Sequence, residues 1–206
     1  MKVKICGLCT EEAVLAAEDA GADFLGFIFY EKSHRHVLPE EVHDLTKHVQ
    51  RAKTVGVFVD APLDEVNAAA DFCSLDFVQL HGHESAAYAR AVCRPVIKAF
   101  RWGDDFSAEE ANDYPAEIIL LDSFSKDAVG GTGQRFRWRE AAEETARLEK
   151  PLLVAGGIAS GNVREAEEVF RPYGVDVSGS LEIEKRKSVE RIREFMAVVQ
   201  KRRIPE

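Results

Sequence analysis

Short apolar runs alternate with amphipathic stretches along the whole chain, and this alternation constrains the fold more than any other feature. The apolar runs have the length of buried strands, and the stretches between them have helical spacing. The predicted strands are Val3–Leu8, Phe24–Tyr30, Thr54–Asp60, Phe77–Gly82, Pro95–Phe100, Ile118–Asp122, Leu152–Ile158 and Val175–Ser178. The predicted helices are Glu11–Ala20, Pro39–Gln50, Leu63–Phe72, Glu84–Val92, Ala108–Asp113, Trp138–Leu148, Asn162–Phe170 and Glu184–Gln200. Apolar strands that alternate with helices predict a parallel sheet covered by helices.

Eight strand–helix units fill the 206 residues without a linker or a change of composition. That number and length fit a compact α/β domain, a single (β/α)8 or TIM barrel over residues 1–206. A doubly wound open sheet is the alternative, but eight evenly spaced units favour closure. Thr10 is the expected N-cap of the first helix and Gly21 its stop signal.

Composition and charge exclude several classes of partner. A formal net charge of −9 argues against nucleic acid and anionic membrane surfaces as partners, since an acidic surface repels both. The sequence contains neither an apolar run long enough to span a membrane nor a signal-peptide core, so we expect a cytoplasmic protein. Met1 leads directly into the first strand, and we expect a free-standing chain. Small anionic substrates remain compatible with this composition.

The four cysteines are predicted to be free thiols, as is usual in a cytosolic protein. Cys6 and Cys9 form a Cys-x-x-Cys pair, which zinc sites and redox centres also use. A structural zinc site needs a second ligand pair, and Cys73 and Cys93 lie far apart in the sequence. We therefore interpret the pair as a coincidence of spacing.

Polar side chains near the strand ends are the candidates for chemistry, because active sites of this barrel lie at the C-terminal ends of its strands. Side chains alternate along a strand, so Lys4 and Cys6 should share the inward face of the first strand. The same rule places Gln79 with His81 on the fourth strand. It directs Asp122, Asp176 and Ser178 inward, and it places Val55, Val57 and Val59 outward with Asp60 on the opposite face. Each polar residue alone fits a helix cap equally well. Together, Cys6, His81, Asp122 and Asp176 indicate a site.

Small residues follow the last two strands, where this fold commonly binds phosphate through backbone N–H groups. These residues are Gly156, Gly157, Ser178, Gly179 and Ser180. The predicted loop Ser123–Arg135 holds a further cluster, Gly130–Gly133. A loop of that length in a compact domain is more often functional than idle, so we interpret Gly131, Thr132 and Gly133 as part of a lid.

Ten short segments, in order and over nearly the whole chain, resemble the phosphoribosylanthranilate isomerase family. They are Lys4–Gly7, Gly26–Phe29, Ser33-x-Arg35, Val55–Val59, Val78–Gly82, Val96–Ala99, Leu120–Asp122, Gly130–Gly133, Ala155–Ile158 and Val175–Ser178. The resemblance implies a TIM barrel of tryptophan biosynthesis that converts N-(5-phosphoribosyl)anthranilate to 1-(2-carboxyphenylamino)-1-deoxyribulose 5-phosphate. This Amadori rearrangement implies no metal and no cofactor, because acid–base catalysis suffices for it.

The resemblance also implies roles for individual residues. Cys6 corresponds to the general base and must act as a thiolate, whereas Asp122 corresponds to the general acid and must carry a proton. Arg35 corresponds to the arginine that binds the anthranilate carboxylate. The remaining substrate-contacting positions correspond to Lys4, His81 and Asp176. The phosphate-binding positions correspond to Gly156, Gly157, Ser178, Gly179 and Ser180.

The chain departs from the family's usual pattern after the eighth strand. Ser178-Gly179-Ser180-Leu181-Glu182 replaces Ser-Ser-Gly-Val-Glu, and the usual Pro-Gly and Lys-Asp beyond it are missing or changed over Ile183–Ser188. Arg137 stands between Phe136 and Trp138, where an acidic or amide residue is common. Two alternative functions remain open: another phosphosugar isomerase or epimerase, and a non-catalytic phosphate-binding barrel. The helix faces fit either a monomer or a homodimer.

Overall fold

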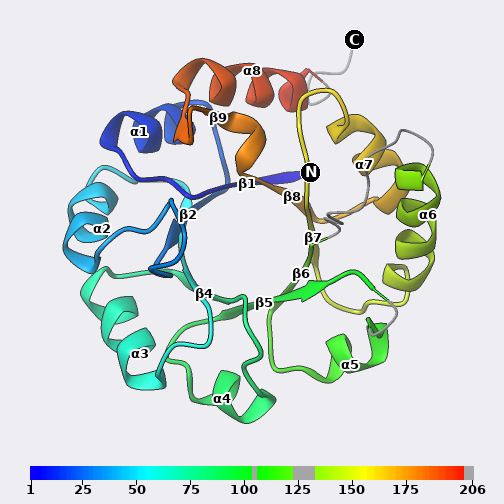
Figure 1. Ribbon diagram of the computed structural model, residues 1–206, viewed down its shortest axis with the longest axis horizontal. Helices are drawn as coiled ribbons and strands as arrows, with labels where there is room; N and C mark the ends of the chain where they lie inside the picture. The colour runs from blue at the N-terminus through cyan, green and yellow to red at the C-terminus, as the bar shows by residue number, and fades with distance from the viewer. Residues whose placement is uncertain (104–105, 123–132, 202–206) are drawn as a thin grey trace.

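Eight parallel strands form a closed barrel, with each strand paired to its sequence neighbours and β8 paired to β1 (Figure 1). This computed structural model describes residues 1–103, 106–122 and 133–201, with the backbone alone for residues 133–137. The barrel strands are β1 Lys2–Cys6, β2 Phe24–Ile28, β3 Lys53–Phe58, β4 Phe77–Leu80, β5 Val96–Arg101, β6 Ile118–Asp122, β7 Leu152–Ala155 and β8 Gly174–Val177. The predicted barrel is confirmed.

Helices surround the barrel as an outer ring (Figure 1). They are α1 Glu11–Asp19, α2 Pro39–Thr46, α3 Leu63–Phe72, α4 Ala86–Ala91, α5 Ala108–Asp113, α6 Gly133–Thr145, α7 Val163–Phe170 and α8 Val189–Gln200. Thr10 caps α1 as predicted, since its side chain accepts a hydrogen bond from the Ala13 N–H. Gly21 follows α1 with φ +80°, a conformation that glycine adopts readily. No helix within the described residues has both the length and the apolar composition of a membrane span.

Two apolar layers hold the fold together. The larger layer lies between the strands and the helices and includes Val3 and Ile5, as the alternation along β1 predicts. The smaller layer fills the barrel itself below the site. It consists of Phe24, Val55, Ile97, Ala99, Ile118, Leu120, Leu153 and Ala155. This packed apolar layer lies directly beneath the polar side chains at the C-terminal ends of the strands.

The predicted orientation of the third strand is wrong. Val55 belongs to the layer inside the barrel, and Val57 and Val59 line the cavity above it. Gly56 and Phe58 face the helices instead, where a Cβ on Gly56 would lie 2.5 Å from the Leu75 side chain. From Val55 to Val59 every residue is apolar or glycine, so no polar side chain within these five residues determines which face of the strand points inward.

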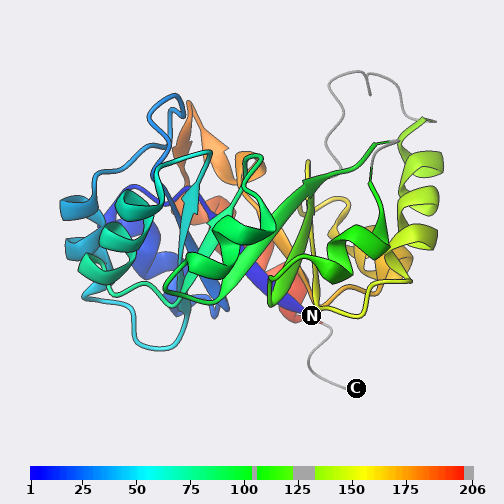
Figure 2. The ribbon, with the colours of Figure 1, turned by 90° about the horizontal axis from the view of Figure 1, so that it is seen from below.

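The largest departure from the predicted elements follows β8. The single turn η1 Gly179–Leu181 leads into a hairpin of β9 Glu182–Ile183 and β10 Arg186–Lys187, which lies at the edge of the barrel opposite the N-terminus (Figure 2). Its tip, Glu184 and Lys185, has positive φ values of 48° and 65°. The predicted start of the last helix at Glu184 is therefore wrong. That helix, α8, begins at Val189 after its N-cap Ser188.

Helix α6 also departs from its predicted bounds. Helix α6 begins at Gly133, five residues before the predicted start at Trp138. Gly133 is thus a helical residue. Gly131 and Thr132, the other two residues of the predicted lid, lie outside the described residues.

Candidate active site

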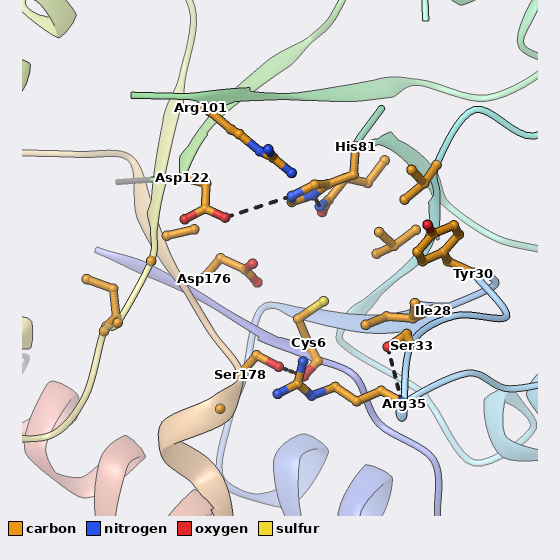
Figure 3. Close-up of a pocket in the computed structure, with 18 of the residues that line it drawn as sticks. Cys6, Ile28, Tyr30, Ser33, Arg35, His81, Arg101, Asp122, Asp176 and Ser178 are labelled. Atoms are coloured by element: carbon orange, nitrogen blue, oxygen red, sulfur yellow. Dashed lines mark hydrogen bonds and ion pairs between the residues drawn. The ribbon is translucent and has the colours of Figure 1, made fainter. Parts of the chain in front are cut away.

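A cavity of about 740 Å³ opens at the C-terminal ends of the strands (Figure 3). Most of the residues singled out from the sequence line it. Its walls comprise Cys6, Ile28, Tyr30, Ser33, Arg35, Val57, Val59, Gln79, His81, Arg101, Asp122, Ala155, Gly156, Gly157, Ile158, Asp176, Ser178, Gly179 and Ser180. Side chains from distant parts of the chain therefore converge on one space. Lys4 is predicted to touch substrate, but it lies behind this wall and is fully buried.

The end of β1 carries Cys6 into the cavity. Gly7 follows with φ +78°, and a Cβ at that position would lie 2.4 Å from the Arg35 side chain. A glycine is thus needed both for the turn and for the close approach of Arg35. The Gly7 N–H donates to the Gly26 carbonyl at 2.9 Å, which fixes the end of β1 against β2.

The surroundings of Cys6 act on its thiol in opposite directions. Burial has the largest effect and raises the pKa of the Cys6 thiol. The Lys4 ammonium lowers this pKa, the Asp176 carboxylate raises it, and Lys187 lowers it. Lys4 and Asp176 themselves form an ion pair, with Nζ 2.8 Å from Oδ1.

The second cysteine of the Cys-x-x-Cys pair takes no part in the cavity. Cys9 is exposed, and its Sγ donates to the Arg35 carbonyl at 3.4 Å. All four cysteines are free thiols. Over residues 1–103, 106–122 and 133–201, no group of three or more His, Cys, Asp or Glu side chains is arranged to hold a metal ion.

Asp122 and His81 face each other across the ends of β6 and the β4 turn (Figure 3). His81 Nε2 lies 3.9 Å from Asp122 Oδ2, which is too long for a direct hydrogen bond. Burial lowers the pKa of His81 more than Asp122 and Asp176 raise it, which favours the neutral ring. Gln79 Nε2 lies 2.8 Å from His81 Nδ1. With Gln79 donating to Nδ1, neutral His81 carries its proton on Nε2, toward Asp122.

The Gln79 side chain also carries an unpaired polar atom. It is almost completely buried, and its Oε1 has no hydrogen-bond partner within the described part of the chain. Buried polar atoms are nearly always paired in folded proteins. Gln79 also lines the cavity, although Oε1 itself is shielded from solvent, so this unpaired acceptor lies just behind the cavity wall. Strand alternation predicts its inward direction, but no sequence pattern assigns it a role.

The loops after β7 and β8 form the wall predicted to bind phosphate. Gly156 and Gly157 have φ values of +86° and +72°, and a Cβ at Gly157 would meet no atom within 4 Å. Asn162 braces this loop, since its side chain bonds both the Ala159 N–H and the Gly157 carbonyl. The glycines thus leave open backbone toward the cavity.

The serines of the β8 loop tie the loops together. Ser178 Oγ donates to the Cys6 carbonyl at 2.9 Å. Ser180 Oγ donates to the Ile158 carbonyl at 2.6 Å. Their hydroxyls therefore fix the loops after β1, β7 and β8 relative to one another.

Arg35 is engaged by a residue that the sequence reasoning missed. Its Nε and Nη2 both donate to the Glu182 carboxylate, and the Nη2–Oε2 distance is 3.0 Å. The Lys187 side chain is 3% exposed and its Nζ lies 2.6 Å from Glu182 Oε1 and 3.3 Å from Ser178 Oγ. Burial alone would raise the pKa of Glu182, but Arg35 and Lys187 lower it to about 2. The two cations and one carboxylate leave one net positive charge beside the cavity.

Arg101 and Tyr30 also line the cavity without having been predicted. Arg101 ends β5 and is paired in register with Asp122 on β6. The alternation that directs Ile97 and Ala99 inward would have identified Arg101, had the predicted strand not ended at Phe100. Tyr30 follows β2 in the structure, but it belongs to the predicted strand Phe24–Tyr30 and has the same parity as the inward Phe24, so the alternation would have identified it as well.

The comparisons with known proteins agree on one family. Residues 3–198 match the family model described as N-(5'phosphoribosyl)anthranilate (PRA) isomerase. The N-(5'-phosphoribosyl)anthranilate isomerase of Geobacter sp. (strain M21) is 46% identical over 205 residues, which covers 97% of this chain and 98% of that protein.

Solved structures of the same family have the same fold. The phosphoribosyl anthranilate isomerase of Thermus thermophilus has a TM-score of 0.86 at 34% identity, and 98% of this chain and 99% of that chain are covered. A phosphoribosyl anthranilate isomerase in complex with reduced 1-(o-carboxyphenylamino)-1-deoxyribulose 5-phosphate has a TM-score of 0.85 at 32% identity, with the same coverage. A structure of monomers generated from the dimeric Thermotoga maritima enzyme has a TM-score of 0.85 at 31% identity, again with that coverage.

Proposed function

The chain belongs to the N-(5'-phosphoribosyl)anthranilate isomerase family, and from this premise we propose that Cys6 is its general base and Asp122 its general acid. It is an isomerase of tryptophan biosynthesis, EC 5.3.1.24, with a small-molecule substrate. The reaction converts N-(5-phosphoribosyl)anthranilate to 1-(2-carboxyphenylamino)-1-deoxyribulose 5-phosphate. The observation that carries the assignment of roles is the convergence of Cys6 and Asp122, from β1 and β6, on one cavity.

The rearrangement begins with two proton transfers, one from the acid and one to the base. The acid gives its proton to the ribose ring oxygen, the bond from that oxygen to C1 breaks, and the anilino nitrogen supplies the electrons that form an iminium. The base then removes the proton from C2, and the electrons of that bond neutralise the iminium to give an enol-amine. Transfer of the enol proton and protonation of C1 complete the ketose. The iminium is the electron sink, so a positioned acid and base are sufficient for this chemistry.

His81 and Gln79 are proposed to assist on the acid side of the cavity. Neutral His81 directs its Nε2 proton toward Asp122, and it does so at a distance that closes to a hydrogen bond with a small movement. Gln79 assists through its hydrogen bond to His81 Nδ1, which holds that proton on Nε2. Asp176 lies between this pair and Cys6 and is suited to accept from the anilino N–H or a hydroxyl (Figure 3).

The anionic groups of the substrate are proposed to bind on the β7, β8 and Arg35 side. The open backbone at Gly156 and Gly157, with Ser178, Gly179 and Ser180, would receive the phosphate. Arg35 would bind the anthranilate carboxylate with the guanidinium edge that Glu182 leaves free. The net positive charge of the Arg35, Glu182 and Lys187 group supports anion binding here despite the acidic composition of the whole chain.

The test is turnover of phosphoribosylanthranilate, followed by the loss of its fluorescence in the presence of EDTA. We expect activity with EDTA, and we expect Cys6→Ala and Asp122→Asn each to lower kcat by roughly 10²–10⁴-fold, the usual contribution of a general acid or base. Cys9→Ala is the matched control and should retain activity. Full activity of either catalytic variant would refute its role. Inactivity of the parent chain, or its inhibition by EDTA, would favour another phosphosugar isomerase or epimerase.

Other properties belong to the same proposal. The chain would act as one (β/α)8 domain over residues 1–206, in the cytoplasm, without a metal or organic cofactor. Both monomer and homodimer are compatible with the description of the Thermotoga maritima structure. A non-catalytic phosphate-binding barrel is the second candidate, and it has no need for both Cys6 and Asp122.

A further inference from the structure

Lys4 is a buried cation to which the proton transfers above give no role. Its side chain is fully shielded from solvent, and its Nζ lies 2.8 Å from Asp176 Oδ1. The register of β1 and β8 places these two residues directly opposite each other. A buried ammonium is unfavourable unless it is paired, and the shielding prevents direct contact with a substrate in the cavity. The charge of Lys4 therefore acts on the groups beside it.

The Cys6 sulfur is such a group. Lys4 and Cys6 are two residues apart and share the inward face of β1, with Gly26 of β2 paired in register to Cys6. A Cβ at Gly26 would lie 2.9 Å from Cys6 Sγ and 3.2 Å from Lys4 Nζ. The sulfur and the ammonium thus border the same small space, which stays open because residue 26 has no side chain.

We propose that Lys4 is a positioning residue for the isomerisation, whose ammonium is the counter-charge of the Cys6 thiolate and is held beside the sulfur by Asp176. This inference rests on the proposed role of Cys6 as general base. A thiol must lose its proton before it can accept one from C2, and thiolates form where a cation adjoins the sulfur. The pair resembles the pairing of a catalytic cysteine with a cationic neighbour, with lysine in place of histidine.

The other charged groups around Cys6 do not replace Lys4. Lys187 on β10 and Arg35 in the loop after β2 also face the thiol, but both are bound to Glu182. Across the cavity stand His81, whose pKa burial lowers, and Asp122. Among these groups, Lys4 alone combines complete burial with a place on the same face of β1 as Cys6.

Asp176 gives the proposal an opposite-sign test. Burial raises the pKa of the Cys6 thiol, Lys4 lowers it and Asp176 raises it. Lys4→Met removes the positive charge at nearly constant shape, so the thiolate becomes harder to form. Asp176→Asn removes the negative charge, while the asparagine side-chain oxygen can still accept the hydrogen bond from Lys4 and hold it in place, so the thiolate becomes easier to form. A residue that only packs the barrel would not produce shifts of opposite sign.

The experiment measures thiolate formation without the substrate. The full chain is treated with iodoacetamide between pH 6 and pH 10, and alkylation at Cys6 is followed by peptide mass spectrometry. At pH 8 we expect Lys4→Met to react about tenfold more slowly than the parent, as expected when a nearby opposite charge is lost. Asp176→Asn should react faster than the parent, and Lys4→Arg should react closer to the parent than Lys4→Met does.

The matched control is Lys53→Met. Lys53 forms an ion pair of the same 2.8 Å length with Asp76, but it is exposed and begins β3 at the other end of the barrel. This variant should alkylate at Cys6 like the parent chain. Circular dichroism tests whether each variant is folded. If Lys4→Met is not folded, the comparison of the alkylation rates of Asp176→Asn and the parent chain tests the proposal.

Equal rates for the parent, Lys4→Met and Asp176→Asn, or changes in the same direction, would overturn the proposal. So would a slower or unchanged rate in Asp176→Asn when Lys4→Met fails to fold. These results are separable from the proposed function. If the alkylation rates shift in opposite directions but the chain does not turn over phosphoribosylanthranilate, the proposed function is refuted and the pairing of Lys4 with Cys6 stands. If the chain turns over phosphoribosylanthranilate but the rates do not shift in this way, the function stands and the role of Lys4 is refuted.

Discussion

Replacing Gly26 with alanine is predicted to damage catalysis far more than it damages the fold. The new methyl group would lie 2.9 Å from Cys6 Sγ, 3.1 Å from Cys6 Cα and 3.2 Å from Lys4 Nζ, whereas ordinary van der Waals separations lie between 3.4 and 4 Å. The sulfur must therefore retreat by about 0.5 Å, and because the backbone of Cys6 is also too close, rotation of its side chain alone does not relieve the overlap. The strands resist as well, because the Gly26 carbonyl accepts from the N–H groups of Gly7 and Leu8 at 2.9 and 3.0 Å.

The expected losses follow from these distances. A displacement of about 1 Å in a reacting group costs on the order of 10² in rate, so a shift of half that size should lower kcat about tenfold. Overpacking of this kind lowers the free energy of unfolding by about 1–3 kcal/mol, which leaves a barrel of this size folded at room temperature. KM should change less than kcat, because the proposed phosphate site lies on other strands.

The measurement is turnover of phosphoribosylanthranilate at 25 °C, with urea unfolding of the same preparation. Gly161→Ala is the matched control, since a Cβ there would meet no atom within 4 Å, and it should keep both activity and stability. Activity of Gly26→Ala within twofold of the parent chain would refute the reasoning. It would mean that the position of the sulfur relative to Lys4 does not limit the reaction.

Two further substitutions test ion pairs, one beside the cavity and one buried away from it. Glu182→Gln should raise KM, because Arg35 and Lys187 lose the carboxylate that holds both cations in position, and this loss of position should outweigh the added positive charge. Because the folded-state pKa of Glu182 is about 2 and its ordinary value is 4.5, the parent chain should lose stability as pH falls through that interval, and the variant should lose less, as measured by urea midpoints from pH 2 to pH 5. Lys98→Met should lower the free energy of unfolding by about 3–5 kcal/mol, because it leaves the buried Glu84 carboxylate, now 2.7 Å from Lys98, without its counter-ion. A loss below about 1 kcal/mol in urea unfolding would contradict the last prediction.

The sequence was sufficient for the fold because each of the eight units repeats the same pattern, so an error in one unit does not change the architecture. Inward and outward faces were predicted correctly where a polar residue breaks an apolar run, as at Lys4 and Gln79. The alternation failed at Val55–Val59, where every residue is compatible with either face. In such a strand, burial alone determines which face points inward, and burial depends on the neighbouring strands.

The hairpin after β8 could not be predicted for a different reason. Glu184 and Lys185 adopt left-handed conformations at its tip, which their residue types disfavour, and their charges fit a helical pattern equally well. Interactions that Glu182 and Lys187 make with distant residues define this segment. One of them joins Glu182 to Arg35 across 147 positions of sequence, a range over which local patterns carry no information.

That ion pair changes what Arg35 is able to do. Two of its nitrogens already bind the Glu182 carboxylate, so it approaches a substrate anion with one remaining edge instead of a free bidentate fork. The strength with which Arg35 binds an anion therefore depends on the net charge of the hairpin. The Lys187 ammonium offsets the negative charge of Glu182, and it bonds to both Glu182 and Ser178. Although the sequence after β8 departs from the usual family pattern, Lys187 keeps a positive charge at the proposed phosphate loop. We therefore expect the loss of Lys187 to weaken anion binding more than a change at Gly179 or Ser180.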